Sequence, residues 1–261
     1  MINVGIVGLG FMAATHIKSY RHVDGARVAA LCSPNGRYLN GDFAGVAGNV
    51  GDNASAKLEP GSFTPYRDFS EMLANPDIHL IDICAPTMAH PELAIAALKA
   101  GKHVICEKPM ARTSNLAKSI LDVAANARGY FMPAMCLRWV PEWLWVKRAI
   151  DDGRFGKVLA ARFRRVAEPP GWGKHNFMVG EKSGGAILDL HVHDVDFVQF
   201  CFGRPLSVFS TGYSHLSGAI DHVVTQYQVS SGAIVHAEGS WAMTPGFGFN
   251  MSYTVNFENI V

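Results

Sequence analysis

The sequence predicts an α/β protein: an N-terminal doubly wound parallel sheet, followed by a C-terminal α+β domain with an open, mostly antiparallel sheet. Three observations lead to this prediction. Short apolar runs alternate with helical segments up to about residue 132, as in a parallel sheet covered by helices on both faces. A glycine-rich turn follows the first apolar run. From about residue 133, apolar and polar residues alternate as they do in antiparallel strands.

The composition limits the class of protein. The chain has 261 residues, 49% hydrophobic and 17% charged, which is enough for two modest domains with cores. A net charge of +1 offers no field that favours nucleic acid or a membrane surface. No apolar run approaches the roughly eighteen residues of a membrane span, and the N-terminus does not resemble a signal peptide. Five cysteines without a C-x-x-C pair suggest reduced, mostly buried thiols. We therefore expect a cytoplasmic protein.

The N-terminal half is predicted to be a dinucleotide-type α/β domain over residues 1–132. Strands are expected at 2–7, 27–32, 78–85, 102–106 and 129–136. Helices are expected at 11–21, 68–74, 91–99 and 114–127. Pro91 suits the start of the third helix and Gly101 suits its end. The glycine-rich segment 35–64 predicts a short helix at most, followed by a surface loop.

The C-terminal half, residues 133–261, is predicted to be an α+β domain. Helices are expected at 141–152, ended by Gly153, and at about 184–202. Strands are expected at 157–166, 206–214, 222–230, 233–241 and 249–257. These strands carry apolar residues on both alternating sets: Val208, Phe209, Val223, Val224, Ile234 and Val235. Because a second apolar face would aggregate in water, we expect the outer face of this sheet to pack on another subunit.

The first motif with chemical meaning is Gly8-x-Gly10-x-x-Ala13, between a strand and a helix. Gly8 allows a tight turn, Gly10 lets the backbone approach a pyrophosphate, and Ala13 permits close helix packing. The free N–H groups at a helix N-terminus favour an anion. Small-residue turns also occur by chance, but this one follows the first strand of an alternating sheet, which predicts a dinucleotide site.

The second strand ends in a way that bears on the cofactor. An acidic residue usually follows there and accepts from the adenosine ribose. This chain has Ser33 at that place and Arg37 shortly after it. A hydroxyl and a nearby cation suit a 2′-phosphate, which favours NADP or dual specificity. Alternatively, Ser33 only caps a helix and Arg37 is a surface charge.

Three stretches together resemble a known family: GIVGLGFM (5–12), DICAPTMAHPELAIAALKAGKHVICEKPMA (82–111) and GGAILDLHVHDVDF (184–197). They are similar, in order and spacing, to the glucose–fructose oxidoreductase / inositol dehydrogenase (Gfo/Idh/MocA) family. The resemblance implies an N-terminal Rossmann domain and a C-terminal domain whose sheet mediates a homodimer or homotetramer. It also implies hydride transfer between NAD(P) and a secondary hydroxyl of a sugar, cyclitol or other polyol. Members are usually longer, so we expect a naturally short or a truncated member.

The Glu107-Lys108-Pro109 signature closes the strand at 102–106. Ligands of parallel sheets bind beyond the carboxyl ends of the strands, so this turn should face the nicotinamide. Lys108 can then bind the reacting hydroxyl, Glu107 can orient it or contact the cofactor, and Pro109 fixes the backbone. The Lys108–Pro109 bond can be cis or trans by sequence. A purely structural ion pair remains the alternative.

By resemblance, Asp189 and His193 complete a catalytic set with Lys108. Four residues apart on a helix, they would share one face. His193 would take the hydroxyl proton as general base, because histidine titrates near neutral pH. Asp189 would hold a neighbouring hydroxyl or orient the other two groups. His191 should point away from His193, which argues against a metal site, and the family is metal-free.

Further contacts are expected on weaker grounds. Pro86, Thr87 and His90 match a stretch that lines the nicotinamide in relatives, although His90 could be a helix cap. Arg138 lies where relatives approach the substrate, or it forms a surface salt bridge. Trp172, with Lys174 and His175, could close over a sugar. Phe11 and Met12 should pack at the cofactor edge.

Two other functions stay open from sequence alone. One is a glycosidase or lyase that retains NAD and cleaves a glycoside through transient oxidation of the sugar. The other is a nucleotide-binding regulator without activity. The Lys108, Asp189 and His193 set argues against the second and does not exclude the first.

Overall fold

A computed structural model describes residues 1–48, 56–171 and 174–261, with side chains in the last range described from residue 176. The chain forms two compact units, Met1–Ala134 and Met135–Val261. In the ranges described, no helix is both long and apolar enough to cross a membrane.

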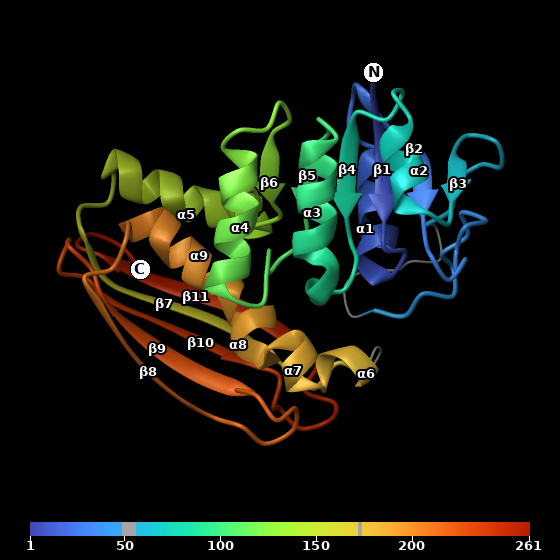
Figure 1. Cartoon of the computed structure of the whole chain (residues 1–261). Coiled ribbons are helices and arrows are strands. Elements are labelled where there is room, and N and C mark those ends of the chain that lie inside the picture. Colours follow the sequence, from blue (N-terminus) through green and yellow to red (C-terminus); the bar gives the residue numbers. More distant parts are fainter. Residues whose placement is uncertain (49–55, 172–173) are drawn as a thin grey trace. The chain divides into compact units, whose positions relative to one another are not determined.

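The first unit is built on a six-stranded parallel sheet with the order β3-β2-β1-β4-β5-β6 (Figure 1). Its strands are β1 (Ile2–Val7), β2 (Ala26–Cys32), β3 (Thr64–Tyr66), β4 (Leu80–Ile83), β5 (His103–Cys106) and β6 (Phe131–Pro133). The order reverses between β1 and β4, the place where doubly wound sheets bind their ligands. The predicted N-terminal fold is confirmed.

Helices cover both faces of this sheet, because alternate strand residues supply two separate apolar clusters. α1 (Phe11–Tyr20) packs on the face that carries Val4, Ile6 and Leu31. α2 (Phe69–Ala74), α3 (His90–Lys99) and α4 (Ser114–Ala124) pack on the face that carries Ile81 and Val104. α3 and α4 run side by side in Figure 1. Both faces of every central strand are therefore buried, as their apolar sequences predict.

The weakly patterned segment 35–64 contains no helix in its described part. Phe43 and Ala56 are fully buried and join the cluster under α1. The strand β3 was missing from the sequence prediction, because it is three residues long and contains Pro65. At the sheet edge, a proline costs only a ladder bond on one side.

The second unit contains a five-stranded sheet with the order β11-β7-β10-β9-β8. Its strands are β7 (Val158–Ala167), β8 (Ser207–Tyr213), β9 (His222–Gln228), β10 (Ile234–Ser240) and β11 (Phe249–Phe257). Only the β7–β10 pair is parallel, so the sheet is mixed and mostly antiparallel, which confirms the prediction.

The core of the second unit lies between one face of this sheet and two helices, α5 (Pro141–Asp152) and α9 (His191–Phe202). Trp143 of α5 stacks on Phe163 and meets Phe197 edge-on. α5 ends at Gly153, which has a left-handed φ of 64°, as the sequence predicted. Aromatic packing of this kind adds about 0.5–1.5 kcal/mol per pair beyond area burial.

One predicted helix is interrupted. The segment 184–202 forms two helices, α8 (Gly185–Asp189) and α9, which meet at Leu190. The Leu190 amide bonds four residues back to Ala186, whereas the His193 amide bonds only three residues back to Leu190. The single-helix prediction was wrong because the apolar pattern does not record this tighter turn. Two further short helices precede it, α6 (Lys174–Phe177) and α7 (Gly180–Ser183).

Candidate active site

The glycine turn after β1 packs against the end of β4. Gly8 has φ +86°, and a Cβ placed on it would lie 2.3 Å from the Cα of Ala85. Gly10 caps α1 and is not crowded in this way: among the residues that the structure describes, a Cβ on Gly10 would meet nothing within 4 Å beyond its chain neighbours and its own helix. α1 receives no side-chain cap and has no acidic residue in its first turn, and Ala13 is fully buried. Open backbone beside an uncapped helix N-terminus fits a pyrophosphate. Phe11 and Met12 are half-buried in that first turn.

The loop after β2 is organised by Asn35. Its Oδ1 accepts from the Ser33 hydroxyl at 2.8 Å and from the Arg37 amide at 3.0 Å. Ser33 is buried, whereas the Arg37 side chain is exposed and its guanidinium lies 5.9 Å from the Tyr38 ring centroid. Ser33 is therefore an internal brace of the turn as well as a candidate cofactor contact. It caps no helix here, since 34–37 contain none.

Sequence reasoning missed a second arginine at this end of the sheet. Arg67, directly after β3, lies against the same loop, since a Cβ on Gly36 would be 2.6 Å from its guanidinium. β3 pairs with β2, so their carboxyl ends meet at one edge. The omission followed from missing β3, because without that strand nothing links Arg67 to Arg37.

The loop after β4 and the turn after β5 are tied together by His90. Its Nδ1 lies 2.8 Å from the Pro109 carbonyl oxygen, and its Nε2 lies 2.8 Å from the Ala85 carbonyl oxygen. Burial lowers the pKa of this imidazole despite its two carbonyl partners. The buried His90 ring therefore links the backbone of the loop after β4 to the backbone of the turn after β5. Pro86 and Thr87 begin the 3-10 turn that leads into it.

The Glu107-Lys108-Pro109 turn leaves the carboxyl end of β5, as predicted, and its Lys108–Pro109 peptide is cis. Glu107 is 7% exposed, and its Oε2 accepts from the Lys108 amide at 3.1 Å. β4 alone separates β5 from β1, so this turn and the glycine turn belong to the same end of the sheet.

A buried polar network lies below this turn on the α1 face of the sheet. His16 of α1 contacts Asp82 of β4 through Nδ1 at 2.8 Å and Glu107 through Nε2 at 3.1 Å. The Tyr20 hydroxyl donates to Asp82 at 3.0 Å. Sequence reasoning used Glu107 but not His16, Tyr20 or Asp82. A carboxylate in the apolar run IHLIDICA was the available signal, because a buried charge needs a partner.

His16, Asp82 and Cys84 also have the composition of a metal-ligand set, with ligand atoms within 4.8 Å of one another. Each of these atoms already takes part in a hydrogen bond. Burial raises the pKa of the Cys84 thiol to about 12, which keeps its sulfur protonated. The geometry therefore describes a hydrogen-bonded network.

In the second unit, Asp189 ends α8 and His193 lies in the first turn of α9. Both are half-buried, and the Cys136 sulfur lies 3.9 Å from His193 Nδ1. The break at Leu190 means that ideal-helix spacing does not describe this pair. His191 is 2% exposed, and its Nε2 lies 2.9 Å from the Thr225 hydroxyl. Burial lowers its pKa to about 4.

Arg138 forms a bidentate ion pair with Asp196 of α9, at 2.8 and 2.6 Å, and lies over the Phe200 ring. Its charge-assisted bonds join the segment before α5 to α9. Trp172 lies outside the described residues, as do the side chains of Lys174 and His175.

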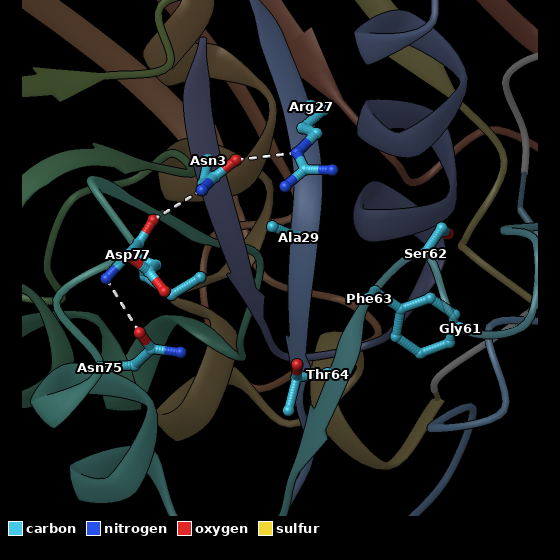
Figure 2. A pocket seen from close by; sticks show the side chains of 10 residues that line it. Asn3, Arg27, Ala29, Gly61, Ser62, Phe63, Thr64, Asn75 and Asp77 are labelled. Atoms are coloured by element: carbon cyan, nitrogen blue, oxygen red, sulfur yellow. Dashed lines mark hydrogen bonds between the residues drawn. The ribbon is translucent and has the colours of Figure 1, made fainter.

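A polar hollow of about 480 Å³ lies elsewhere on the first unit. Figure 2 shows Asn3 joined to Arg27 and to Asp77, and Thr64 also lines the hollow. These residues lie at or before the amino-terminal ends of their strands. Because ligands of parallel sheets bind beyond the carboxyl ends, this hollow is not the candidate active site.

Comparison with known families identifies both units. A family described as "Oxidoreductase family, NAD-binding Rossmann fold" matches residues 2–134, and the "GFO/IDH/MocA C-terminal domain" matches residues 143–259. The chain belongs to the Gfo/Idh/MocA oxidoreductase family. Its first unit is thus an NAD-binding Rossmann fold, as the glycine turn indicated.

Two relatives of this Gfo/Idh/MocA protein are named as dehydrogenases of levoglucosan and of myo-inositol. Levoglucosan dehydrogenase of Pseudarthrobacter phenanthrenivorans is 30% identical, over 78% of this chain and 52% of that protein. Myo-inositol 2-dehydrogenase of Thermotoga maritima is 26% identical, over 89% of this chain and 66% of that protein. The chain thus matches about half to two thirds of the length of these relatives.

Solved structures agree in fold. A levoglucosan dehydrogenase in complex with NADH superposes with a TM-score of 0.81 at 23% identity, over 98% of this chain and 71% of that one. The WlbA dehydrogenase of Bordetella pertussis, in complex with NADH and UDP-GlcNAcA, has a TM-score of 0.81 at 24% identity, over 98% and 76%. At these identities the likeness establishes the fold alone.

Proposed function

We propose that this protein is an NAD(P)-dependent oxidoreductase that transfers hydride between a nicotinamide and a secondary hydroxyl of a sugar, cyclitol or glycoside. The observation that carries the proposal is the end of the first sheet. There, an uncapped helix N-terminus beside an open Gly10 and the turn bearing Lys108 follow β1 and β5, with β4 between them. A pure nucleotide-binding regulator would have no use for a lysine held at that place.

The cofactor site we propose consists of the residues that follow the carboxyl ends of the strands. They are Gly8, Gly10, Phe11, Met12, Ser33, Arg37, Pro86, Thr87, His90, Glu107 and Lys108. Their geometry supports the proposal, since Gly10 leaves open space where the pyrophosphate needs it. When bound, the nicotinamide supplies the hydride acceptor or donor.

The catalytic roles follow from chemistry. Lys108 binds the reacting hydroxyl oxygen and stabilises its developing negative charge. His193 takes the hydroxyl proton as general base, and Asp189 holds or orients the neighbouring groups. Arg138 and Trp172 are the further substrate contacts in this proposal. For Arg138, the bidentate bond to Asp196 leaves part of the guanidinium for a sugar hydroxyl.

We propose that NADP is accepted at least as well as NAD. Near the carboxyl end of β2 the chain has Ser33 in place of an acid, so no carboxylate at that position repels a 2′-phosphate. Arg37 is exposed there, and Arg67 approaches the same loop from β3. Two guanidinium groups can each donate charge-assisted hydrogen bonds to a phosphate.

We further propose a homodimer or homotetramer that forms through the sheet of the second unit, with residues 133–261 as the substrate and oligomerisation domain and 1–132 as the dinucleotide domain. β8 is exposed along its whole length. Phe209 is 71% exposed and Ile234 is 61% exposed, on strands of the same sheet. An exposed apolar sheet of this kind favours burial against a second copy.

The function is tested with a panel of sugars, cyclitols and glycosides, each with NAD and NADP, by following nicotinamide absorbance. We expect oxidation of at least one substrate that depends on Lys108. Glycoside cleavage without net accumulation of reduced cofactor would replace this proposal with redox-assisted cleavage. Failure of the protein to bind either cofactor would refute it.

A further inference from the structure

A continuous chain of hydrogen bonds links the dinucleotide helix to the Lys108 peptide. The Tyr20 hydroxyl and His16 Nδ1 both contact Asp82 Oδ2, at 3.0 and 2.8 Å. His16 Nε2 contacts Glu107 Oε1 at 3.1 Å, and Glu107 Oε2 accepts from the Lys108 amide at 3.1 Å. Both Glu107 carboxylate oxygens are thus occupied, one from each side. The carboxylate has a defined orientation below the turn.

The charges in this hydrogen-bonded network are unusual for a protein interior. Asp82 is fully buried and Glu107 is 7% exposed, and both carboxylates contact the imidazole of His16. Removing a carboxylate from water is costly unless a cation and hydrogen bonds compensate for it. A neutral imidazole donates from one nitrogen only, whereas an imidazolium donates from both. The geometry at His16, with a carboxylate at each ring nitrogen, fits the imidazolium.

Neighbouring groups favour the same charge state. Burial disfavours the cation at His16, but the charge of the Asp82 carboxylate and its hydrogen bond to the imidazole oppose burial, and the pKa of His16 is raised above 6.5. Burial likewise opposes the Glu107 anion, but His16 and then Lys108 lower the pKa of Glu107 overall. The Tyr20 hydroxyl, the Cys106 thiol and the His90 imidazole also interact with the carboxylates of the network. Burial raises the pKa of the first two and lowers the pKa of His90.

We propose that His16 is a positioning residue for the reactive lysine: it links Asp82 to Glu107 and so holds the Glu107 carboxylate against the Lys108 backbone. This inference rests on the proposed function of Lys108. His16 lies on α1, six residues after Gly10, so one rigid helix carries both the proposed pyrophosphate site and this brace. Loss of the brace releases Glu107 and allows the Lys108 turn to move. A displacement of about 1 Å at a reacting group can cost about a hundredfold in rate.

Two substitutions separate the two contacts of His16. The amide nitrogen of asparagine lies near the position of Nδ1, so His16→Asn keeps a donor to Asp82 and loses Glu107. The amide nitrogen of glutamine lies near Nε2, so His16→Gln keeps a donor to Glu107 and loses Asp82. Ser19→Ala is the matched control on α1, since Ser19 is exposed and its hydroxyl donates to the Thr15 carbonyl of the same helix.

We expect His16→Asn to lower kcat about ten- to a hundredfold, with NADH affinity by fluorescence titration within about threefold of wild type. The fold-loss of kcat in His16→Gln should be less than about a third of the fold-loss in His16→Asn. Ser19→Ala should have the kcat and NADH affinity of wild type. A purely structural role predicts instead that both His16 variants lose the same activity and stability. Equal losses in the two variants, or a His16→Asn kcat within threefold of wild type, would overturn the proposal.

A second readout does not need turnover. Nitrogen-15 NMR of the eleven histidines should show one imidazole that keeps protons on both nitrogens at about pH 8, where an ordinary histidine is neutral. That signal should vanish in His16→Gln and lose its double protonation in Glu107→Gln. If no imidazole is doubly protonated at that pH, the brace is absent whatever the activity. If the signal is present but no sugar or cyclitol is oxidised, the network stands and the proposed function fails.

Discussion

The two glycines of the first turn should respond in opposite ways to the same substitution. A methyl group on Gly8 would lie 2.3 Å from the Ala85 Cα and 2.4 Å from its nitrogen, at a φ of +86°. A methyl group on Gly10 would meet no other described part of the chain within 4 Å apart from its neighbours and its own helix, at a φ of −106° that any residue adopts. Gly8→Ala therefore tests the packing of the turn, and Gly10→Ala tests the space in front of it.

The magnitudes follow from these contacts. A left-handed non-glycine residue costs about 1–2 kcal/mol, and overpacking against fixed backbone adds about 1–3 kcal/mol. Gly8→Ala should thus lower the free energy of unfolding by roughly 2–5 kcal/mol, or Tm by roughly 6–20 °C. Gly10→Ala should cost about 1 kcal/mol or less in stability. It should weaken cofactor binding about ten- to a hundredfold, because a methyl group displaces one charge-assisted backbone contact to the pyrophosphate.

Differential scanning calorimetry and fluorescence titration with NADH measure the two effects separately. Gly45→Ala is a suitable control, since Gly45 is exposed and a Cβ there also meets nothing within 4 Å in the described part of the chain. It should change neither Tm nor affinity. If Gly10→Ala binds NADH as wild type does, the pyrophosphate does not lie at this turn. If Gly8→Ala has the Tm of wild type, Gly8 does not lie as close to the Ala85 backbone as the structure shows.

Further outcomes are expected at other residues. Lys108→Ala should lower kcat by two to four powers of ten, roughly 3–5 kcal/mol of barrier, with little change in cofactor affinity; activity within threefold of wild type would contradict its role. His193→Ala should remove a rise of the oxidation rate with pH, measured where chemistry limits the rate. Arg37→Ala and Arg67→Ala should each weaken NADP more than NAD by about tenfold, and equal effects on both cofactors would make them surface charges. Because the pKa of His16 is raised in the folded protein, protonated His16 should contribute its full stabilisation below about pH 6.5. That contribution should disappear as pH rises through the pKa of His16 in the folded protein. The difference in unfolding free energy between wild type and His16→Gln should therefore shrink as pH rises over this range.

The first sheet could be predicted because its signals are local. Runs of four to seven mostly apolar residues specify β1, β2, β4 and β5 one at a time, and a predicted helix follows each of them except β2. The glycine turn and the Glu107-Lys108-Pro109 turn follow directly from the ends of those strands. The parallel-sheet rule then assigns both turns to one edge without any knowledge of register.

The features that were missed depend on pairing or on small changes of geometry. β3 is a strand only because it pairs with β2. That pairing places Arg67, directly after β3, beside the loop that carries Arg37. The break at Leu190 changes one hydrogen bond from four residues back to three and leaves the apolar pattern intact. Such a change alters the angle between Asp189 and His193, so periodicity alone gives the wrong local geometry for a pair of residues on either side of it.

The His16 network lies between these two cases. His16 and Tyr20 are four residues apart on α1 and share a face, and an aspartate in an apolar strand demands a partner. Both halves of the contact were visible in the sequence, 66 residues apart. The contact becomes predictable only once β1 and β4 are paired, because that pairing puts Asp82 opposite Ile6 and turns its side chain to the α1 face. A buried carboxylate in a central strand is therefore a reason to search the sequence of the covering helix for a basic partner.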